Sequence, residues 1–351
     1  MNTLHTDSPP MAILKGFGIA GAEVRSFGSG LINRTWKIGG PTKSYILQQI
    51  NDGVFKQPRD IAYNIRIIAE FIKKNHPDYF FVSPVLDDTG QDILFSEKDG
   101  WFRLMPFVEN SFTFDTVQTP EQAYEAAKQF GKFTKKLSGF DAVKLKITIP
   151  HFHDLDLRYQ QFLKAIAEGN SKRVGESQHT ISSLLEQKNI VSEYRSITQN
   201  PEFKKRVTHH DTKISNVLFD ENKKGICVID LDTVMPGYFF SDVGDMMRTY
   251  ISPVSEEEMD LDKISVRSDF YKAIVEGYCD QMNDELTPIE KEHFFFAGKF
   301  MIYMQALRFL TDHLNDDIYY GAKYEGHNLM RAKNQLRLLE RLIEMNGVKQ
   351  N

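Results

Sequence analysis

Over its first hundred residues, the chain alternates apolar and polar positions in the short runs that are typical of β-strands. RTWKI and SYILQQI are separated by the turn residues GGPTK, which predicts one hairpin between residues 34 and 50. QDILF and WFRLMPFV flank SEKDG, which predicts a second hairpin between residues 91 and 108. A small antiparallel sheet is therefore expected near the N-terminus.

Helical periodicity first appears between these hairpins and dominates from residue 119 onward. After Asp60, a predicted N-cap, four isoleucines recur at helical spacing: Ile61, Ile65, Ile68 and Ile72. A second helix is expected to begin after Thr119, with Pro120 at its first position and Gln122 completing a capping box. Gly347 is expected to stop the last helix, whose apolar face carries Leu336, Leu339 and Ile343.

These patterns divide the 351 residues into two lobes, the number that this length favours. Residues 1–107 are predicted to form a β-rich N-lobe and residues 108–351 a larger helical C-lobe, with the crossing near Pro106. A short β-hairpin at residues 216–232 interrupts the helices of the C-lobe. Because ligands favour clefts between lobes, this hairpin is the first place to look for a site.

Composition and charge narrow the class of protein. A net charge of -5 and a pI near 6.1 give no basic surface, which argues against nucleic acid as a partner. The two cysteines, Cys227 and Cys279, follow neither a metal-binding nor a disulfide spacing, so a reducing, cytoplasmic compartment is expected. The N-terminus lacks the pattern of a signal peptide, and no apolar run of about 18 residues predicts a membrane span.

Acidic, basic and amide side chains crowd the entry to the hairpin, in the stretch VTHHDTKISNVLFD. If the hairpin is symmetric about Lys223, Asn216 lies opposite Asp230, with the two Cβ atoms about 5 Å apart. An amide oxygen and a carboxylate at that spacing can share one Mg²⁺, whose other ligands are phosphates and water. Asp211 then lies close enough to accept a proton from an attacking hydroxyl, and Lys213 can face a phosphate.

A purely structural interpretation of these residues stays open. Taken singly, His209 fits a structural hydrogen-bonding residue, and Lys213 fits a solvated charge. Asp230 is harder to explain in this way, because it interrupts the apolar strand ICVIDLD. A carboxylate buried there without a partner or a metal would be costly, which favours a functional site.

The motifs resemble those of a known superfamily of kinases. HHDTKISN matches the kinase catalytic loop, with a His, an Asp two residues later, a Lys two beyond it, and an Asn five after the Asp. VIDLD takes the place of the second metal-binding Asp, whereas DFG, APE and an activation loop are absent. The chain thus resembles the aminoglycoside phosphotransferase and choline kinase-like superfamily, which implies an α+β, bilobal protein-kinase-like fold.

Further segments narrow the resemblance to the N-acetylhexosamine 1-kinases and extend it over nearly the whole chain. They are GSGLINRTW, YILQQIN, HHDTKISNVLFD, VIDLDTVMPG, DVGDMMR, RFLTDHL and EGHNLMRAKNQL. The resemblance implies ATP-dependent phosphorylation of the anomeric hydroxyl of GlcNAc or GalNAc, with Mg²⁺. It also implies that the N-lobe binds the nucleotide and that the C-lobe binds the sugar.

The resemblance further implies roles for individual residues. Asp211 would be the catalytic base, with Lys213 assisting at the phosphates, and the metal would be held by Asn216 and Asp230. Arg248, in DVGDMMR, would brace a neighbouring carboxylate.

For the acceptor sugar, the resemblance implies contacts with Asp211, Thr233, Arg308 and Tyr319. Arg308 and Asp312 lie four residues apart on a predicted helix, so an ordinary ion pair between them is an alternative to sugar binding.

The nucleotide site carries one departure from the kinase pattern. Gly28 and Gly30, in FGSGLIN, follow a predicted strand and would let the backbone approach the ATP phosphates. The next strands should carry a Lys that pairs with the phosphates and with a helix Glu, but Gln48 stands in its place and the helix offers no Glu nearby. Arg34 and Lys43 are the nearest candidate cations.

Other functions remain open. A kinase of the same fold can act on an amino alcohol or an aminoglycoside, and the acidic run VSEEEMDLD would suit such a cation, although a solvated helix start explains it as well. A catalytically silent nucleotide or sugar sensor would fit the missing Lys–Glu pair, but it has no need of a base and metal ligands together. A metal-dependent hydrolase would need a fuller ligand cluster, which the sequence lacks.

Overall fold

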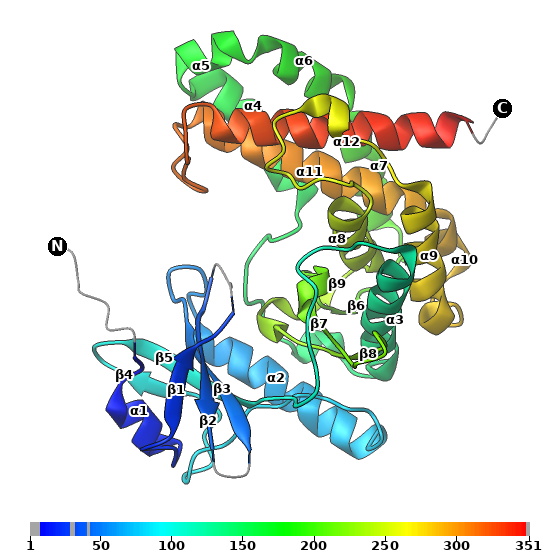
Figure 1. Cartoon of the computed structure of the whole chain (residues 1–351). Helices are drawn as coiled ribbons and strands as arrows, with labels where there is room; N and C mark the ends of the chain where they lie inside the picture. Colours follow the sequence, from blue (N-terminus) through cyan, green and yellow to red (C-terminus); the bar gives the residue numbers. More distant parts are fainter. Residues whose placement is uncertain (1–7, 29–31, 41–42, 349–351) are drawn as a thin grey trace. The chain divides into compact units, whose positions relative to one another are not determined.

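The computed structural model describes residues 8–28, 32–40 and 43–348 (Figure 1). The chain forms two compact units. The first unit contains residues 1–113, 136–150 and 217–236, and the second unit contains residues 114–135, 151–216 and 237–351. The N-terminal residues are thus joined in one unit by two later segments, one of which includes the hairpin predicted at residues 216–232.

A five-stranded antiparallel sheet forms the centre of the first unit, in the order β1-β2-β3-β5-β4. Its strands are β1 (Glu23–Ser26), β2 (Arg34–Gly39), β3 (Ser44–Ile50), β4 (Leu94–Ser96) and β5 (Gly100–Pro106). Both predicted hairpins are confirmed, since β2 pairs with β3 and β4 pairs with β5. The short strands follow directly from the alternation of apolar and polar residues in the sequence.

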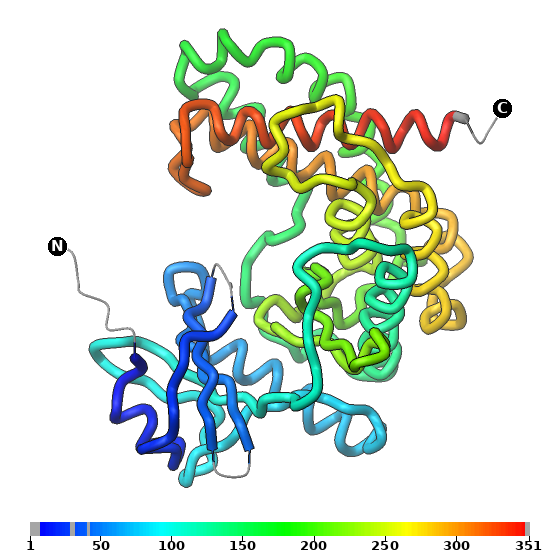
Figure 2. Tube along the Cα trace, in the orientation of Figure 1, coloured from blue at the N-terminus to red at the C-terminus, as the bar shows by residue number. Residues whose placement is uncertain are grey.

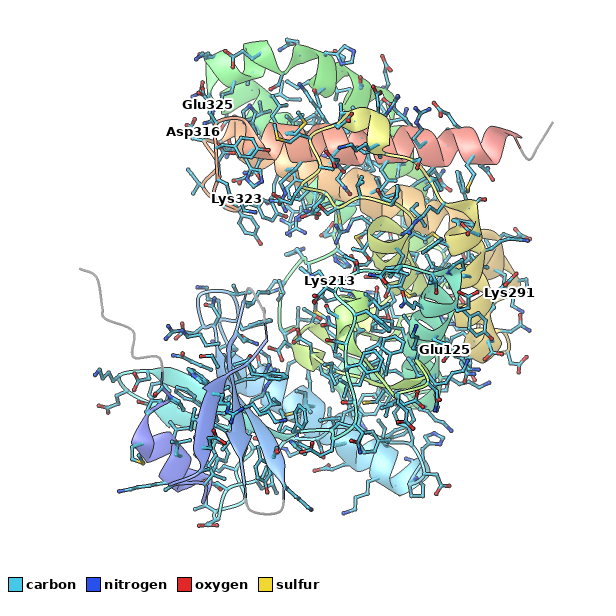
Figure 3. The ribbon with its side chains drawn as sticks, viewed as in Figure 1. Glu125, Lys213, Lys291, Asp316, Lys323 and Glu325 are labelled. Carbon is cyan, nitrogen blue, oxygen red and sulfur yellow. The ribbon has the colours of Figure 1, made fainter. Side chains whose placement is uncertain are left out.

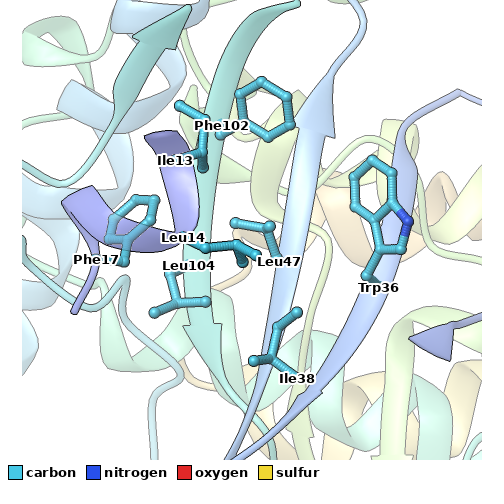
Figure 4. Packing of buried hydrophobic residues seen from close by; sticks show 8 residues of the cluster. All are labelled: Ile13, Leu14, Phe17, Trp36, Ile38, Leu47, Phe102 and Leu104. Carbon is cyan, nitrogen blue, oxygen red and sulfur yellow. The ribbon is translucent and has the colours of Figure 1, made fainter. Parts of the chain in front are cut away.

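One face of this sheet is covered by the short helix α1 (Met11–Gly16), as Figure 4 shows. Ile13 and Leu14 of this helix, with Phe17 after it, pack on a row of side chains from three strands: Trp36, Ile38, Leu47, Phe102 and Leu104. Residues two apart on a strand face the same side, which is why Trp36 and Ile38 share the cluster. The sequence did not predict α1, because six residues are too few to show a helical period.

Helix α2 (Pro58–Asn75) belongs to the same unit and buries the four isoleucines that predicted it. Its N-cap is Gln57 rather than Asp60, because Pro58 takes the first helical position and places Asp60 inside the first turn. Asn64 of α2 is fully buried, and its amide donates to the carbonyl oxygens of Lys146 and Val234 at 2.9 and 3.0 Å. This side chain therefore fastens both later segments of the first unit to the helix.

The second unit is helical, as predicted. Its helices are α3 (Pro120–Lys136), α4 (Leu155–Glu168), α5 (Ser171–Glu176), α6 (Gln178–Glu186), α7 (Asn189–Gln199), α8 (Phe239–Tyr250), α9 (Ser268–Met282), α10 (Pro288–Glu292), α11 (Phe294–Leu314) and α12 (His327–Val348). The capping box before α3 is confirmed, since Thr119 N–H donates to Gln122 Oε1 at 3.2 Å and Gln122 N–H donates to Thr119 Oγ1 at 3.4 Å.

Helix α11 is buried along most of its length and packs along α12, which the chain trace shows in orange and red (Figure 2). Leu336 and Leu339 of α12 are buried as predicted, whereas Ile343 is 36% exposed and the adjacent Leu342 is buried in its place. The helix also runs through Gly347 to Val348 instead of stopping at the glycine. Among the described residues, no helix is long and apolar enough to cross a membrane.

The hairpin of β7 (Val217–Phe219) and β8 (Gly225–Val228) corrects the predicted register. Val217 pairs with Val228 and Leu218 with Cys227, so the hairpin is not symmetric about Lys223 and does not set Asn216 opposite Asp230. The cause is the turn, in which the Asp220 carboxylate accepts two backbone N–H groups, from residues 222 and 224, and an irregularity follows Leu218. A shift of one residue reverses the face of every side chain, so the geometric argument from this register was wrong.

Short elements complete the chain. The remaining strands are β6 (Arg206–Thr208) and β9 (Met235–Gly237). Single turns of 3-10 helix lie at Ala142–Lys144, Ile214–Asn216, Leu231–Thr233 and Leu261–Lys263. Asn216 thus ends a helical turn rather than beginning a strand.

Candidate active site

The second unit brings Asp211 and Lys213, from the loop after β6, together with Asn216, from the helical turn that follows this loop. Lys213 Nζ lies 3.1 Å from Asp211 Oδ1 (Lys213 is labelled in Figure 3). The amide of Asn216 donates to both the backbone oxygen and Oδ2 of Asp211, at 2.8 and 3.1 Å. Both hydrogen bonds come from the amide nitrogen of Asn216, so its side-chain oxygen is the atom that can bind a metal. The three side chains predicted for this loop therefore lie in contact with one another within this unit.

The charges in this cluster keep Asp211 ionised. Burial alone would raise the pKa of the Asp211 carboxyl, but the charges of Lys213 and His209 and the hydrogen bonds from Lys213 and Asn216 outweigh it, so the pKa lies below the ordinary 3.8. Burial would likewise lower the pKa of Lys213, but Asp211 and Asp245 raise it above 10.5. At neutral pH the loop therefore presents a carboxylate beside an ammonium.

Helix α8 anchors the loop that carries Asp211 through one buried carboxylate, Asp242. Asp242 accepts the backbone N–H of His210 at 2.7 Å and that of His209 at 3.1 Å. Burial raises the pKa of Asp242 to about 7, although the two backbone hydrogen bonds lower it. His210 has a positive φ of 69°, a conformation that non-glycine residues rarely adopt and that this anchoring maintains.

Thr212 is held from three directions by the same helix. Its backbone N–H donates to Asp245 Oδ2 at 2.8 Å, and its hydroxyl donates to the carbonyl oxygen of Asp242 at 2.8 Å. Its own carbonyl oxygen accepts the hydroxyl of Tyr250 at 2.5 Å. The residues on either side of Asp211 are thus fixed, which restricts where its carboxylate can lie.

Two histidines near Asp211 have structural roles. The ring of His209 is buried against Phe130 and Phe133, and its Nδ1 accepts the backbone N–H of Asp211 at 3.3 Å. The structural interpretation of His209 is therefore the correct one. The ring of His210 fits only because residue 237 is glycine, since a Cβ there would lie 2.4 Å from His210 Cε1.

A contact that the sequence did not reveal connects His210 to α4's N-terminal side. Ser241 Oγ lies 2.7 Å from His210 Nδ1 and 2.5 Å from His153 Nδ1, so one hydroxyl joins two imidazoles. A hydroxyl has one proton to donate and two lone pairs that accept, so at least one of the two rings must donate to the Ser241 oxygen. No sequence spacing predicts this contact, because His153 and Ser241 are 88 residues apart.

Arg248 braces carboxylates, as the resemblance implied. Its guanidinium contacts Asp245 Oδ1 at 3.0 Å and Glu256 Oε2 at 2.8 Å. Glu256 also pairs with Arg331, and Glu257 pairs with His327 at 2.8 Å. The acidic run VSEEEMDLD is therefore not the start of a solvated helix. Its three glutamates instead form ion pairs with Lys and Arg side chains of the second unit.

In the first unit, Arg103 explains the departure at Gln48. Arg103 and Asp232 form an ion pair in which both side chains are almost fully buried. Gln48 Oε1 accepts from Arg103 Nε at 2.9 Å, because the two residues are directly paired between β3 and β5. A lysine at position 48 would set a second cation against this guanidinium, so the neutral glutamine follows from the arginine on the next strand.

The same contacts separate the roles of the two hairpin carboxylates. Asp232 Oδ2 accepts from Asn33 Nδ2 at 2.7 Å in addition to its ion pair with Arg103. Both carboxylate oxygens of Asp232 are therefore engaged by side chains of the first unit. Asp230, which has a left-handed φ of 60°, stays the carboxylate predicted to bind the metal.

The residues predicted to hold Mg²⁺ have suitable chemistry. Among residues 8–28, 32–40 and 43–348, no cluster of three or more His, Cys, Asp or Glu side chains could hold a metal. Mg²⁺ needs no such cluster, because it is commonly bound by one or two protein oxygens together with phosphates and water. Asn216 and Asp230 offer oxygens of this kind.

The predicted nucleotide and sugar residues of the first unit are only partly described. Gly28 has a φ of 77°, which glycine adopts without strain, and it lines a small hollow beside β1 and β2. Gly30 lies outside the described residues. Thr233 is buried in the helical turn after Asp230.

The structure brings the predicted sugar residues Arg308 and Tyr319 to one cavity of about 470 Å³ within the second unit. This volume falls in the range of small-molecule sites. The walls come from α4, from the end of α11 and from the loop that follows α11. Arg308 forms no ion pair with Asp312 within the described part of the chain, so that alternative was wrong.

Asp312 instead fixes the loop that carries Tyr319. Its carboxylate accepts the backbone N–H groups of Tyr319 and Tyr320 at 2.7 and 2.9 Å, and the amide of Asn328 at 3.1 Å. The side chain of Tyr319 itself is 73% exposed. Figure 3 labels Asp316, Lys323 and Glu325 of this loop, which connects α11 to α12. A buried carboxylate thus presents an exposed aromatic ring at the edge of the cavity.

Comparison with known proteins identifies a matching family and a shared fold. The Phosphotransferase enzyme family matches residues 23–284, well over half of the chain. Among solved structures, a microcompartment-associated aminopropanol kinase is similar with a TM-score of 0.63 and 17% identity, over 96% of this chain and 97% of that chain.

Two further solved structures have the same fold. A spectinomycin phosphotransferase in complex with ADP and spectinomycin has a TM-score of 0.59 and 14% identity, over 96% of this chain and 97% of that one. A choline kinase from Cryptosporidium parvum has a TM-score of 0.58 and 12% identity, over 96% of each chain. These likenesses confirm the predicted kinase-like fold, with an antiparallel N-terminal sheet and a helical C-terminal part.

We expect Arg103→Leu to destabilise the first unit by about 3–5 kcal/mol, because it leaves Asp232 as an uncompensated buried charge. Urea unfolding followed by tryptophan fluorescence measures this, since both tryptophans, Trp36 and Trp101, lie in the first unit. Arg25→Leu is the matched control, because the Arg25–Glu23 pair is mostly exposed and its loss should change little. Equal unfolding midpoints for the two variants would contradict the role given to Arg103.

Proposed function

The chain belongs to the phosphotransferase enzyme family, and on that premise we propose that it is an ATP-dependent kinase of N-acetylhexosamines that phosphorylates the anomeric hydroxyl. The observation that carries this proposal is the cavity of the second unit. Arg308 and Tyr319, which the resemblance to N-acetylhexosamine 1-kinases assigns to the sugar, line it together. The same unit carries the Asp211 loop, so base and acceptor residues belong to one body.

Asp211 has the properties of the residue that receives the acceptor's proton. Its carboxylate is ionised, and its neighbours in the loop are held by α8. Phosphoryl transfer has a loose transition state, in which a weak base mainly orients the hydroxyl and takes its proton late. A carboxylate with a low pKa is adequate for that task. Lys213 contacts its Oδ1 and Asn216 donates to its Oδ2, so the two side chains fix the orientation of the carboxylate.

ATP and Mg²⁺ are proposed as the donor and its metal. Asn216 and Asp230 would hold the ion, which supplies charge neutralisation at the phosphates when it is bound. The ADP named with the spectinomycin phosphotransferase supports an adenine nucleotide for this fold. Gly28 and Gly30 are the proposed backbone contacts of the phosphates, and Lys213 is a proposed cation beside them.

A second candidate keeps the fold and the donor but changes the acceptor. The solved structures include kinases named for aminopropanol and choline, and a phosphotransferase named for spectinomycin. An amino alcohol or an aminoglycoside is therefore the alternative acceptor class. A silent sensor is the weaker alternative, because the Asp211 cluster is complete and because Gln48 is explained by Arg103.

We expect MgATP turnover with GlcNAc or GalNAc and none with choline, homoserine or kanamycin. Asp211→Asn should lower kcat by about 10²–10⁴-fold, because it removes the proton acceptor. Coupled ADP release measures both results, and exposed Asp284→Asn is the matched control. Turnover with an amine acceptor alone would agree with the phosphotransferase family but contradict the proposed sugar acceptor. Full activity of Asp211→Asn would contradict the proposed role of Asp211 as the base.

We expect Lys213→Met to move the acidic limb of the pH profile of kcat/KM to higher pH. The ammonium 3.1 Å away helps to hold the pKa of Asp211 below 3.8, so without it the base becomes protonated at a higher pH. Turnover across the acidic range measures the limb. Lys272→Met, on an exposed part of α9, is the control. An unmoved limb would mean that Lys213 does not set the charge state of Asp211.

A further inference from the structure

The cavity of the second unit contains two guanidinium groups. Arg158 reaches it from α4 and Arg308 from α11, and the two residues are 150 positions apart in the chain. Of these two arginines, the sequence predicted only Arg308 as a residue that binds the acceptor. Arg158 had no motif around it that would mark it as part of a site.

Neither guanidinium is neutralised by an acid. Arg158 donates to Gln161 Oε1 at 3.0 Å and to the carbonyl oxygen of His151 at 2.9 Å. Arg308 donates to Gln305 Oε1 at 3.3 Å. All these partners are neutral oxygens, and within the described part of the chain neither arginine forms an ion pair. Two positive charges therefore face one cavity.

The other charges of the cavity wall are already engaged. Lys164 lies 3.6 Å from Glu168, and both side chains are mostly exposed. Asp312 is tied to the backbone N–H groups of the loop after α11. Burial lowers the pKa of Arg158, and the charge of Arg308 lowers it further, which reflects the cost of holding the two cations close together.

The cavity also contains hydrogen-bond donors that are not used. The Nε atom of Arg158 and the hydroxyl of Thr311 are buried and have no hydrogen-bond partner among the residues that the structure describes. Thr311 and Arg158 both line the cavity. Buried donors without partners are rare in proteins, and a ligand with oxygen atoms would satisfy them.

The cavity is linked to the catalytic loop. The charges of Arg308 and Arg158 both act on His153, whose pKa is well below its ordinary value through burial, through His210 and through these arginines. His153 is in turn joined to His210 by the hydroxyl of Ser241, and His210 precedes Asp211. His153, Ser241 and His210 thus connect the surroundings of the two guanidiniums with the Asp211 loop inside the second unit.

We propose that Arg158 and Arg308 form a paired-guanidinium site that binds oxygen atoms of the acceptor and rejects acceptors that carry a cation. Arg158 is thereby a specificity-determining residue. This inference rests on the proposed function only in that the cavity holds the acceptor. A guanidinium donates hydrogen bonds and accepts none, so hydroxyl, carbonyl or carboxylate oxygens suit it. An ammonium group would add a third positive charge to the same partly buried space.

The test compares acceptors that differ in charge on one sugar ring. Binding of GlcNAc, which is neutral, and of glucosamine, which is protonated at about pH 6.5, is measured by calorimetry without nucleotide. We expect the wild-type protein to bind GlcNAc at least about tenfold more tightly than glucosamine. Arg158→Gln should weaken GlcNAc binding by about tenfold to a hundredfold, because a hydrogen bond from a charged group is lost. The same substitution should narrow the preference over glucosamine.

Two further variants control this result. Arg195→Gln also removes a guanidinium near α4, but Arg195 pairs with Asp156 outside the cavity, so both affinities should stay as in the wild type. Arg158→Lys keeps the charge and loses the planar fork, so it should still reject glucosamine while binding GlcNAc less tightly than the wild type. A thermal melt shows whether Arg158→Gln folds. If it does not fold, Arg158→Lys still tests how the affinity for GlcNAc depends on the guanidinium.

The outcomes separate this inference from the proposed function. GlcNAc turnover with an affinity ratio that Arg158→Gln leaves unchanged would overturn the paired site and keep the kinase. GlcNAc turnover could also be absent while the protein still prefers neutral over cationic sugars in a way that depends on Arg158. That result would support the paired-guanidinium site and contradict the proposed N-acetylhexosamine kinase activity. Tighter wild-type binding of choline or kanamycin than of GlcNAc would overturn the charge rule directly.

Discussion

The carboxylate of Asp242 is the interaction on which the candidate site depends. It accepts the backbone N–H groups of His209 and His210, and it does so from inside α8, a helix buried over most of its length. A loop with a left-handed His210 would relax without such a partner. Because Asp245 and Tyr250 of the same helix hold Thr212, the backbone on both sides of Asp211 is fixed. Helix α8 thus fixes the position of Asp211, the proposed base.

Much of this arrangement was readable from the sequence, because it depends on local spacing. The alternation in RTWKI and SYILQQI gave the N-terminal hairpin, and the isoleucines of α2 gave its buried face. Asp211, Lys213 and Asn216 cluster because they lie within six consecutive residues, which a spacing pattern can record.

What the sequence did not reveal depends on contacts between distant segments. Arg103 meets Gln48 across two strands and Asp232 from the hairpin, and Ser241 joins two histidines from different segments. The register of β7 and β8 was predicted by symmetry, but the hydrogen bonds of Asp220 in the turn set it one residue away. Arg158 is visible only once α4 and α11 form one cavity.

In the proposed reaction, Asp211 orients the anomeric hydroxyl of an N-acetylhexosamine and accepts its proton as the phosphoryl group is transferred to that oxygen. The most direct measurement is phosphorus NMR of the product formed from GlcNAc and MgATP by the full chain. The proposed function predicts one sugar phosphate resonance, coupled to the anomeric proton. Coupling to the protons of carbon 6 instead, or the appearance of inorganic phosphate alone, would contradict it.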